Sequence, residues 1–409
     1  MALLGIVLFA LGILVSVCLH EAGHMATAKA FGMKVTRYFV GFGPTLFSFR
    51  RGETEYGVKA IPLGGFVKIV GMTPQDDDVD PKDEPRVMWR FPVWKRTIVM
   101  AAGSVAHFVL AVVVLWVTFV FVGVSNPELN KPQPAVVDVV DCVVTTPETR
   151  ECRASDPDSP AKKAGLQNGD KIVKVNDTAV ANYDELRTAI RTTPAGKANV
   201  TVERNGETVV VPVELASVTR PSDDPKAPAS KTQNVSALGI KVHLTVPLMV
   251  KYGPIEGVNQ TGKTVGELFV GIFKSLKQIP SKVPALLRAL SGGERDKETP
   301  VSVVGASRIG GELAQAGLWS TFLLLFAVLN LFYGVFNLLP LLPMDGGHIA
   351  ISWFEKVRSW IAARRGKADP GRVDYVKLTP ITLAVISVLG VFVLLTVTAD
   401  IVNPISIFR

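Results

Sequence analysis

Four stretches of this chain consist mainly of apolar residues, and each is long enough to cross a lipid bilayer as a helix, which takes about 20 residues. They cover, approximately, residues 3–28, 98–124, 318–342 and 381–397. The long region between the second and third stretches is mixed in character. The pattern therefore predicts four membrane-spanning helices and a sizeable water-soluble part.

A different periodicity marks the segment after the first stretch. Residues 45–50 and 54–60 alternate apolar and polar positions, which predicts a β-hairpin. Non-helical backbone at membrane depth must be shielded by protein or line a watery cavity, and an edge strand there can pair with an extended peptide. The hairpin is either such a re-entrant, substrate-binding element or a cytoplasmic hairpin without that role. The glycines that bracket it, and would line its substrate side, are Gly41, Gly43, Gly64 and Gly65.

The region after the second stretch carries the pattern of a small α+β domain. A short helix, a glycine turn and a strand follow one another in residues 159–176, and residues 184–190 are helical in pattern. Two further strands, 198–202 and 208–213, surround Asn205-Gly206. This order resembles a PDZ domain, in which a peptide adds a strand to a sheet edge. Such a domain acts as a peptide receptor or as a steric filter.

Residues 217–234 are rich in Pro, Asp, Lys and Ser, which indicates a linker. Apolar residues then recur at helical spacing from Val265 to Ile279, which predicts an amphipathic helix; Pro280 and Pro284 would break or bend it. This helix packs against the spans, lies on the membrane surface or gates access. The predicted parts are a first membrane half, a PDZ domain with a cysteine-bearing insertion, a linker with the amphipathic helix, and a second membrane half, at 1–124, 126–216, 217–316 and 317–409.

Composition supports an α-helical polytopic membrane protein, because 48% of the residues are hydrophobic and 20% are charged. The net charge of +8, taken alone, would suggest that the protein binds nucleic acid. However, Lys and Arg gather beside the apolar stretches, which favours anionic lipid and membrane topology, and we expect no nucleic-acid partner. The loops between the first two and the last two spans are the basic ones, so they are predicted to be cytoplasmic. The PDZ domain and both termini are then extracytoplasmic in a multi-pass protein of the plasma membrane.

The first stretch contains His20-Glu21-Ala22-Gly23-His24. Two histidines four residues apart share one helix face and can bind one metal ion, and neutral imidazole is a good zinc ligand. Glu21, beside them, can accept a proton from a water molecule. The alternatives are a chance match of the motif or two buried histidines that only pack.

The third stretch leads into Asn337-Leu-Leu-Pro340-Leu-Leu-Pro343-Met-Asp345-Gly346-Gly347-His348. An unpartnered carboxylate at that depth is costly. Binding of zinc by Asp345 removes the cost, because a carboxylate oxygen is an accepted third ligand. The alternatives for Asp345 are a helix cap or a protonated buried acid, and we favour the metal ligand.

Together these motifs resemble those of bacterial site-2 proteases, which are intramembrane zinc metalloproteases, and most closely the actinobacterial members with one PDZ domain, of the regulator of sigma-E protease type. The resemblance implies Zn²⁺ as cofactor and cleavage of single-span membrane proteins, often anti-sigma factors already trimmed by a first protease. It also implies that Asn337 helps to hold the scissile carbonyl. The motifs that carry it are His20-Glu21-x-x-His24, Gly41-Phe-Gly43, Pro62-Leu-Gly-Gly65, Gly103-x-x-x-His107, and Asn337-x-x-Pro340 with Asp345-Gly346.

His107 departs from the family pattern, which often has Asn at this position. His107 is an additional metal ligand, a proton carrier, or a residue that packs by hydrogen bonding or supports a metal ligand without binding the metal. We favour the packing or supporting role. We expect His348 to be structural or interfacial and His243 to lie far from this chemistry.

Two of the three cysteines, Cys142 and Cys152, flank an insertion in a compartment that permits disulfides. Their separation of ten residues can close a loop, so we predict a disulfide between them. Cys18, beside the metal motif, is expected to pack.

Two other classes of function fit parts of the pattern. A catalytically silent membrane adaptor would use the PDZ domain alone, and a metal transporter would use the histidines and Asp345 as transit sites. A transporter needs polar residues along a path through the bilayer, whereas here they gather at one level. We therefore predict hydrolysis of an unwound substrate segment, in which Glu21 accepts a proton from the attacking water and Asn337 helps to stabilise the oxyanion.

Overall fold

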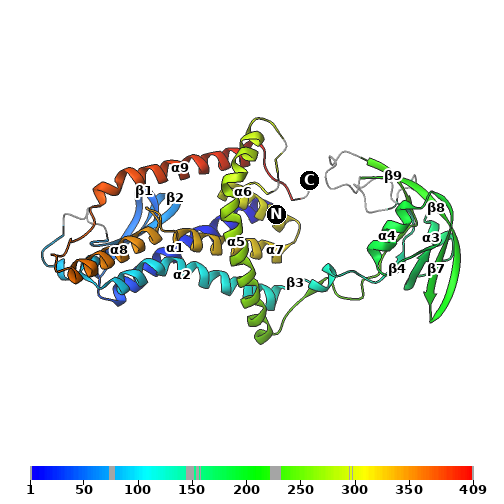
Figure 1. Ribbon diagram of the computed structural model, residues 1–409, viewed down its shortest axis with the longest axis horizontal. Helices are drawn as coiled ribbons and strands as arrows, with labels where there is room; N and C mark the ends of the chain where they lie inside the picture. The colour runs from blue at the N-terminus through cyan, green and yellow to red at the C-terminus, as the bar shows by residue number, and fades with distance from the viewer. Residues whose placement is uncertain are drawn as a thin grey trace. The chain divides into compact units, whose positions relative to one another are not determined.

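The computed structural model describes residues 2–72, 79–143, 152, 156, 158–221, 232–293, 295–296 and 298–407. These residues form two compact units (Figure 1). The helical unit comprises Met1–Val124 and Lys251–Arg409, and the sheet unit is Ser125–Val250. The chain therefore leaves the helical unit once and returns to it.

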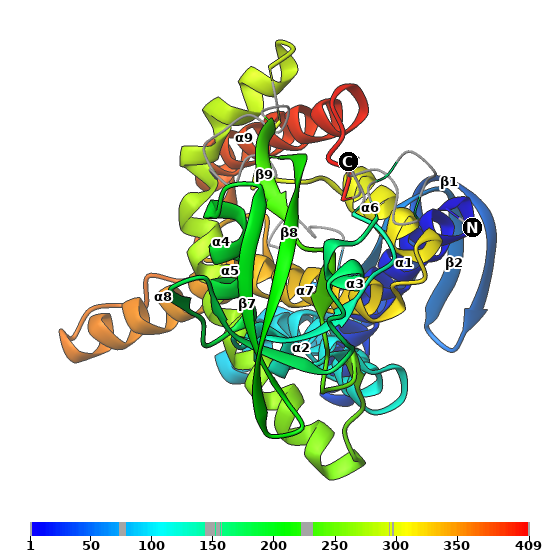
Figure 2. The ribbon, with the colours of Figure 1, turned by 90° about the vertical axis from the view of Figure 1, so that its right-hand side faces the viewer.

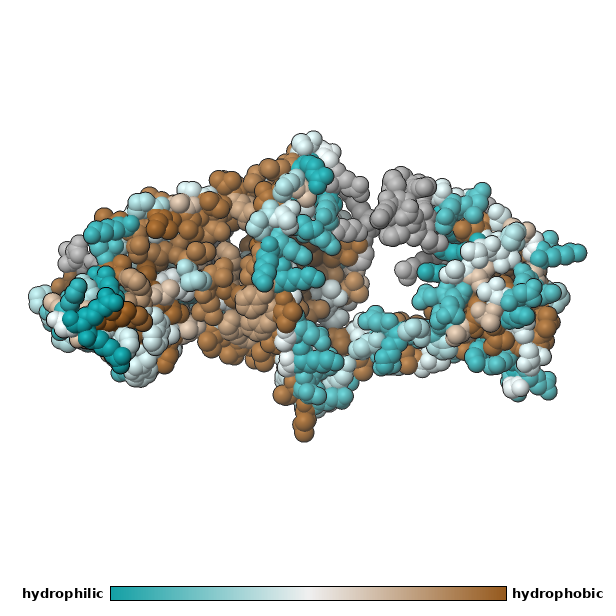
Figure 3. All heavy atoms as spheres, viewed as in Figure 1, coloured by the Kyte–Doolittle hydropathy of each residue, from teal (hydrophilic) through white to brown (hydrophobic). Residues whose placement is uncertain are grey.

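Within the described residues, four helices of the helical unit are long and apolar enough to span a membrane. Figure 3 shows apolar side chains spread over the outer surface of this unit. The shortest of the four has 19 residues, or about 29 Å at 1.5 Å per residue, close to the thickness of the hydrocarbon core. The four predicted spans are confirmed as helices of the required length and composition. They are α1 (Ala2–Ala30), α2 (Val93–Val117) with its π-helical continuation η3 (Thr118–Val122), α7 (Trp319–Asn337) and α9 (Tyr375–Val402).

The third span is shorter than the sequence pattern predicts. α7 ends at Asn337, five residues before the predicted end at residue 342, and Asp345 begins a separate helix, α8 (Asp345–Arg364). Pro340 and Pro343 fall in the connection, where the missing N–H groups end helical hydrogen bonding. Asp345 is therefore carried by the start of a separate helix, which contacts α2 through the ion pair of Glu355 with Arg96.

The predicted amphipathic helix is longer than expected, because Pro280 and Pro284 lie inside it. Its apolar face, which includes Ile272, packs against α2 and α7. A further helix packs on α1 through small residues, since a Cβ atom at Gly5 would lie 2.5 Å from that of Ala314. These elements and two short 3-10 turns are α5 (Pro254–Leu290), α6 (Val303–Gln315), η1 (Glu84–Arg86) and η2 (Met88–Arg90).

The β-hairpin is present, with the predicted turn, but its strands are longer than the alternating pattern indicates. β1 (Val35–Arg51) and β2 (Thr54–Ile69) pair antiparallel with several register shifts. Residues 37–40 pair with residues 65–68 on one side and with residues 55–58 on the other. The hairpin therefore folds back on itself as a small sheet, in which the segment 65–68 lies at an outer edge.

The sheet unit is built around one antiparallel sheet in the order β10-β4-β5-β7-β8-β9, with β6 beside β5. Figure 2 shows its long strands with α4 beside them. A separate pair of two-residue strands, β3 (Val124–Ser125) and β11 (Met249–Val250), lies where the chain enters and leaves the unit. The other elements are η4 (Pro127–Asn130), β4 (Val136–Val139), α3 (Pro160–Lys163), β5 (Asp170–Val175), β6 (Thr178–Ala179), α4 (Tyr183–Thr192), β7 (Gly196–Arg204), β8 (Glu207–Pro221), β9 (Thr232–Ala237) and β10 (Ile240–Val242).

The sheet unit extends beyond the boundary at residue 216 that the sequence suggests. β8 continues to Pro221, and β9 pairs with it from Thr232, so both ends of the predicted linker belong to the sheet. Residues 222–231, the middle of that linker, lie outside the described residues. The core is apolar and includes Ile172, Leu186 and Val200. The unit ends at Val250.

Cys142 and Cys152 are joined by a disulfide, with their Cα atoms 5.8 Å apart. This is the pairing that the sequence predicts. It closes the base of the insertion, of which residues 144–151 lie outside the described residues.

Candidate metal centre

Two histidines of α1 form the first half of the centre. His20 and His24 lie one helical turn apart and are both buried. Their Nε2 atoms are 3.1 Å apart. His24 donates a hydrogen bond from Nδ1 to the carbonyl oxygen of Val99 on α2, 2.7 Å away. Because a carbonyl only accepts, Nδ1 carries the proton, and the lone pair on Nε2 is left for a metal.

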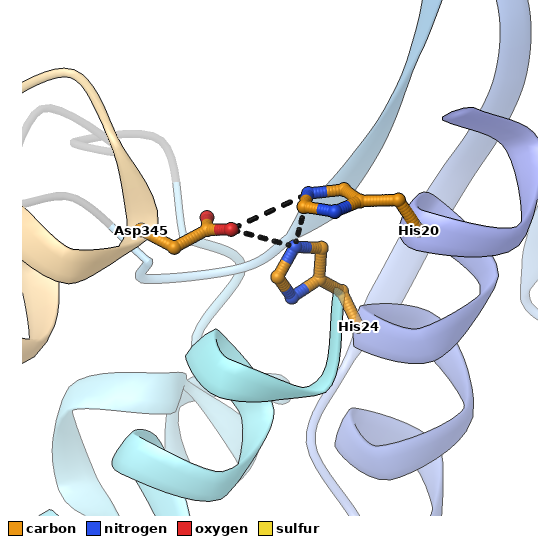
Figure 4. A group of neighbouring side chains, drawn as sticks. All are labelled: His20, His24 and Asp345. Atoms are coloured by element: carbon orange, nitrogen blue, oxygen red, sulfur yellow. Dashed lines mark hydrogen bonds and ion pairs between the residues drawn. The ribbon is translucent and has the colours of Figure 1, made fainter. Parts of the chain in front are cut away.

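Asp345, the first residue of α8, supplies the other half. Its Oδ2 atom lies 3.3 Å from His20 Nε2 and 3.4 Å from His24 Nε2. Figure 4 shows the carboxylate directed at both rings, which come from successive turns of α1. One ligand atom from each of the three residues lies within 4.8 Å of the others.

The environment of Asp345 tests whether these residues fit a metal. Its Oδ2 atom is buried, and within the described residues it has no hydrogen-bond partner. A buried carboxylate oxygen in that state is costly, and a cation shared with His20 and His24 removes the cost. Two imidazoles and one carboxylate also form a ligand set that zinc accepts at catalytic sites, with one position left for water or substrate. The three side chains therefore fit zinc.

Glycines allow the helices to meet at this point. A Cβ atom at Gly103 of α2 would lie 2.5 Å from both His20 Cε1 and His24 Nε2. A Cβ atom at Gly23, within the histidine motif, would lie 2.6 Å from the carbonyl oxygen of Ala102. No side chain fits at either position. The close approach of α1 and α2, typical of helices packed through small residues in membranes, therefore depends on both glycines.

Glu21 lies between the ligand histidines and the hairpin. Its carboxylate accepts a hydrogen bond from the backbone N–H of Val67, on the outer edge of the hairpin. A Cβ atom at Gly65 would lie 3.4 Å from Glu21 Cγ. The candidate base is thus held beside both the metal ligands and an open strand edge.

The other glycines of the predicted substrate surface serve the hairpin itself. Gly41 and Gly43 have φ angles of 88° and 83°, which a residue with a side chain rarely adopts. A Cβ atom at Gly41 would also lie 2.8 Å from the carbonyl oxygen of Ile61 in the opposite strand. Gly64, with φ at 131°, lies in the bend of β2. These residues shape the edge that a substrate would meet.

Asn337 is the last residue of α7. Within the described residues, no hydrogen bond or ion pair joins its side chain to His20, His24 or Asp345. Its amide is therefore uncommitted, and its role at the centre stays a prediction.

His107 lies on α2 one turn beyond Gly103, with its ring 5.1 Å from that of His20 between centroids. Its Nδ1 atom is 2.9 Å from Asn330 Oδ1 and 3.1 Å from Ser16 Oγ. His107 is not part of the ligand group. Ser16 and Asn330 were not predicted at the site. Each is an isolated polar residue in an apolar stretch, which is the sequence signal that points to such a position.

Two remaining histidines lie outside this group. His348, on α8, has its Nδ1 atom 3.3 Å from the hydroxyl of Tyr375. His243 pairs with Asp138 at 2.8 Å within the sheet unit. Neither offers an atom to the ligand group.

His20, Glu21 and His24 lie on an apolar helix of bilayer length, and Asp345 joins them from the start of α8. This arrangement defines a membrane metallopeptidase. The sequence pattern of Peptidase family M50 matches residues 8–378. The chain belongs to this family, that of the site-2 proteases.

Two mycobacterial proteins named Zinc metalloprotease Rip1 are similar to this chain over its whole length. The one from Mycolicibacterium smegmatis is 47% identical over 413 residues, and the one from Mycobacterium tuberculosis is 44% identical over 405 residues. Each alignment covers 99% of both chains. The chain is therefore a multi-pass membrane zinc metalloprotease with Zn²⁺ as its cofactor, as the sequence predicts.

Proposed function

We propose that this protease cleaves single-span membrane proteins inside the bilayer, and that its substrates include anti-sigma factors already trimmed by a first protease. The observation that carries the proposal is the group of His20, His24 and Asp345 with Glu21 beside it, in which both histidines and Glu21 lie on a helix of bilayer length. A peptide bond cut there must reach the centre from within the membrane. A single-span substrate is the simplest chain that can present one.

His20, His24 and Asp345 hold the zinc ion. Zinc in this position supplies Lewis acidity to the reaction. The bond from His24 to Val99 fixes the tautomer that leaves Nε2 for the metal. Buried surroundings exclude bulk water from both histidines, which strengthens every charge interaction inside the centre.

Glu21 is the general base. Its place beside the ligands lets it take the proton of the attacking water and pass it to the leaving amine. The Val67 N–H orients its carboxylate. The amide of Asn337 makes no hydrogen bond within the part of the chain that the structure describes, and it donates to the oxyanion as charge develops there.

The hairpin holds the substrate. A helical substrate hides its carbonyls in its own hydrogen bonds and must unwind before attack. The edge at residues 65–68 offers main-chain groups to such an unwound strand, and Glu21 lies against that edge. An added strand would thus carry its carbonyls past the base. This assignment makes Gly41, Gly43, Gly64 and Gly65 part of a re-entrant substrate surface.

The sheet unit is a PDZ domain on the extracytoplasmic side, with both termini on that side. A cavity of about 280 Å³ lies between α4 and the segment that leads into the edge strand β10. Gly239, with φ at 79°, precedes β10 and lines this cavity, where a PDZ domain receives the carboxylate of a peptide. Three cations, Arg187, Arg191 and Arg220, line it as well. This domain therefore takes a peptide terminus; a purely steric role predicts no such binding.

The proposed function is tested with purified full-length protein in lipid nanodiscs and a panel of single-span substrates. Cleavage should occur inside the spanning segment, stop on dialysis against a zinc chelator and return with added zinc. A silent adaptor predicts no cleavage of any substrate. A transporter predicts zinc flux in sealed vesicles, again without cleavage.

A further inference from the structure

Three polar side chains meet inside the helical unit, beside the metal centre but outside its ligand group. They are Ser16 of α1, His107 of α2 and Asn330 of α7, here called the Ser16–His107–Asn330 cluster. Each is at most 3% exposed. Since all three helices are candidate spans, these side chains lie where polar groups are expensive and rarely without a role.

The hydrogen bonds of the cluster have one consistent direction. Asn330 donates from Nδ2 to the carbonyl oxygen of Phe326, 2.9 Å away, which fixes the orientation of its amide. Asn330 Oδ1 therefore accepts, and it receives the hydroxyl of Ser16 and the Nδ1–H of His107. The same N–H also lies 3.1 Å from Ser16 Oγ. The amide oxygen of Asn330 thus accepts hydrogen bonds from both other side chains, and His107 donates to it through Nδ1.

The cluster lies one or two helical turns from a residue at or beside the metal centre on each helix. Ser16 precedes His20 by four residues on α1, and His107 follows Gly103 by four residues on α2. Asn330 precedes Asn337 by seven residues, two turns along the same face of α7. The helix that carries both ligand histidines, α1, is therefore joined to α2 and α7 one turn from His20.

Apolar spans need such a link. Lipid tails are as apolar as leucine, so hydrophobic burial does not set how far one span slides or rotates against another. The small-residue contact at Gly103 permits a close approach but gives no directional bond. Rotation by one residue would turn His20 by about 100° away from Asp345. Directional hydrogen bonds can exclude that rotation.

We propose that the Ser16–His107–Asn330 cluster sets the register of α1 against α2 and α7, and thereby holds His20 where it shares a zinc ion with His24 and Asp345. The inference rests on the metal centre proposed above and assigns positioning residues to it. His107 acts as a donor through Nδ1 and not as a fourth ligand, in agreement with its absence from the ligand group.

The two ring nitrogens of His107 can be separated by substitution. Asparagine places its amide nitrogen on Cγ, as Nδ1 is placed, whereas glutamine extends its amide toward the position of Nε2. We expect His107→Asn to keep zinc affinity within less than about tenfold of the natural protein, and His107→Gln and Asn330→Leu to lose about 10- to 100-fold. Zinc affinity is measured by chelator competition on purified full-length protein in nanodiscs. The absorption spectrum of the cobalt-substituted protein reports the ligand geometry, and it should change only in the second pair.

Thr118→Val is the matched control. Thr118 is equally buried and lies in the same span as His107, but its hydroxyl bonds to Val114 within its own helix. It should leave zinc affinity and the cobalt spectrum unchanged. Ser16→Ala, which removes one hydroxyl and leaves the bond from His107 to Asn330, keeps the test open if Asn330→Leu does not fold. Ser16→Ala should lower zinc affinity measurably, by a smaller factor than Asn330→Leu.

The proposal is overturned if folded Asn330→Leu or Ser16→Ala binds zinc with the affinity of the natural protein and gives the same cobalt spectrum. It is also overturned if His107→Gln keeps zinc affinity and His107→Asn loses it, because His107 would then act through Nε2. Failure of the metal assignment itself has a different signature, because His24→Ala would then retain zinc.

Discussion

The imidazole of His24 and the carbonyl oxygen of Val99 are 2.7 Å apart across the contact between α1 and α2. This bond ties the chemistry of one span to the backbone of the next. It fixes the tautomer of His24. Because the acceptor is a backbone carbonyl, the bond does not depend on the side chain of Val99. A substitution of the Val99 side chain therefore leaves this bond in place.

Glu21→Gln should retain zinc and lose cleavage. The amide keeps the shape of the carboxylate but cannot accept the proton of the attacking water. His24→Ala should lose both zinc and cleavage, because it removes a ligand. Zinc content by elemental analysis and cleavage of a single-span substrate distinguish the two variants. Cleavage by a verified Glu21→Gln protein would contradict the role of the base.

Gly103→Ala should lower zinc affinity by about 10- to 100-fold, the range expected when the support of a ligand is disturbed. The added methyl would lie 2.5 Å from both ligand rings and must displace them. Gly390→Ala in α9 is the control, because a Cβ atom there meets nothing within 4 Å. Chelator competition on both proteins measures the difference. Equal affinities would mean that α2 does not limit the position of the histidines.

Asn337→Ala should leave zinc bound and slow the chemical step by about 10²–10³-fold, the usual cost of removing one oxyanion donor. Because the amide acts on the developing charge, kcat should fall while KM changes little. Initial rates of cleavage over a range of substrate concentrations measure both parameters. A rise in KM at constant kcat would place Asn337 in substrate binding instead.

Reporter fusions at Gly206 and Gly366 should lie on opposite sides of the membrane. Both glycines have positive φ and an open surrounding, so an insertion there disturbs no packing. The expectation follows from the Lys and Arg residues of the loop between α7 and α9. An alkaline phosphatase fusion should be active at Gly206, and a fluorescent protein that folds only in the cytoplasm should be active at Gly366. The same side for both would overturn the four-span topology.

Asp170→Asn should destabilise the sheet unit. Burial alone would raise the pKa of Asp170, but the guanidinium of Arg204, with two bonds of 2.7 Å, and the N–H of Gln167 hold this pKa below its usual value. Because the native pKa is lowered, the carboxylate stabilises the unit above the unfolded value of about 3.9. That contribution is lost as the pH falls through the native pKa.

The expected loss for Asp170→Asn is about 1–3 kcal/mol in the free energy of unfolding at neutral pH, and less at acid pH. Hydrogen exchange of β5 and β7 in the full-length protein measures it. Lys171→Gln is the control, because its pair with Glu203 is about half exposed and exposed pairs contribute little. A loss that did not shrink toward acid pH would assign the effect to packing instead of charge.

Local sequence patterns determined several features of the fold and of the candidate site. The four spans, the placement of His20, Glu21 and His24 on one helix, and the hairpin turn all depend on residues close together in sequence. Apolar length and spacing report such features directly. The zinc protease function followed from the same short motifs.

Tertiary structure decided where distant residues meet. The sequence placed Asp345 just after the third apolar stretch but could not show that it begins a new helix. It could not show that Ser16 and Asn330, separated by 314 residues, share a hydrogen bond, or that the sheet unit closes at Val250. Periodicity gives the direction in which a side chain leaves its own helix or strand. Which partner it finds there depends on close packing between elements, and at this centre on the glycines that let α1 and α2 touch.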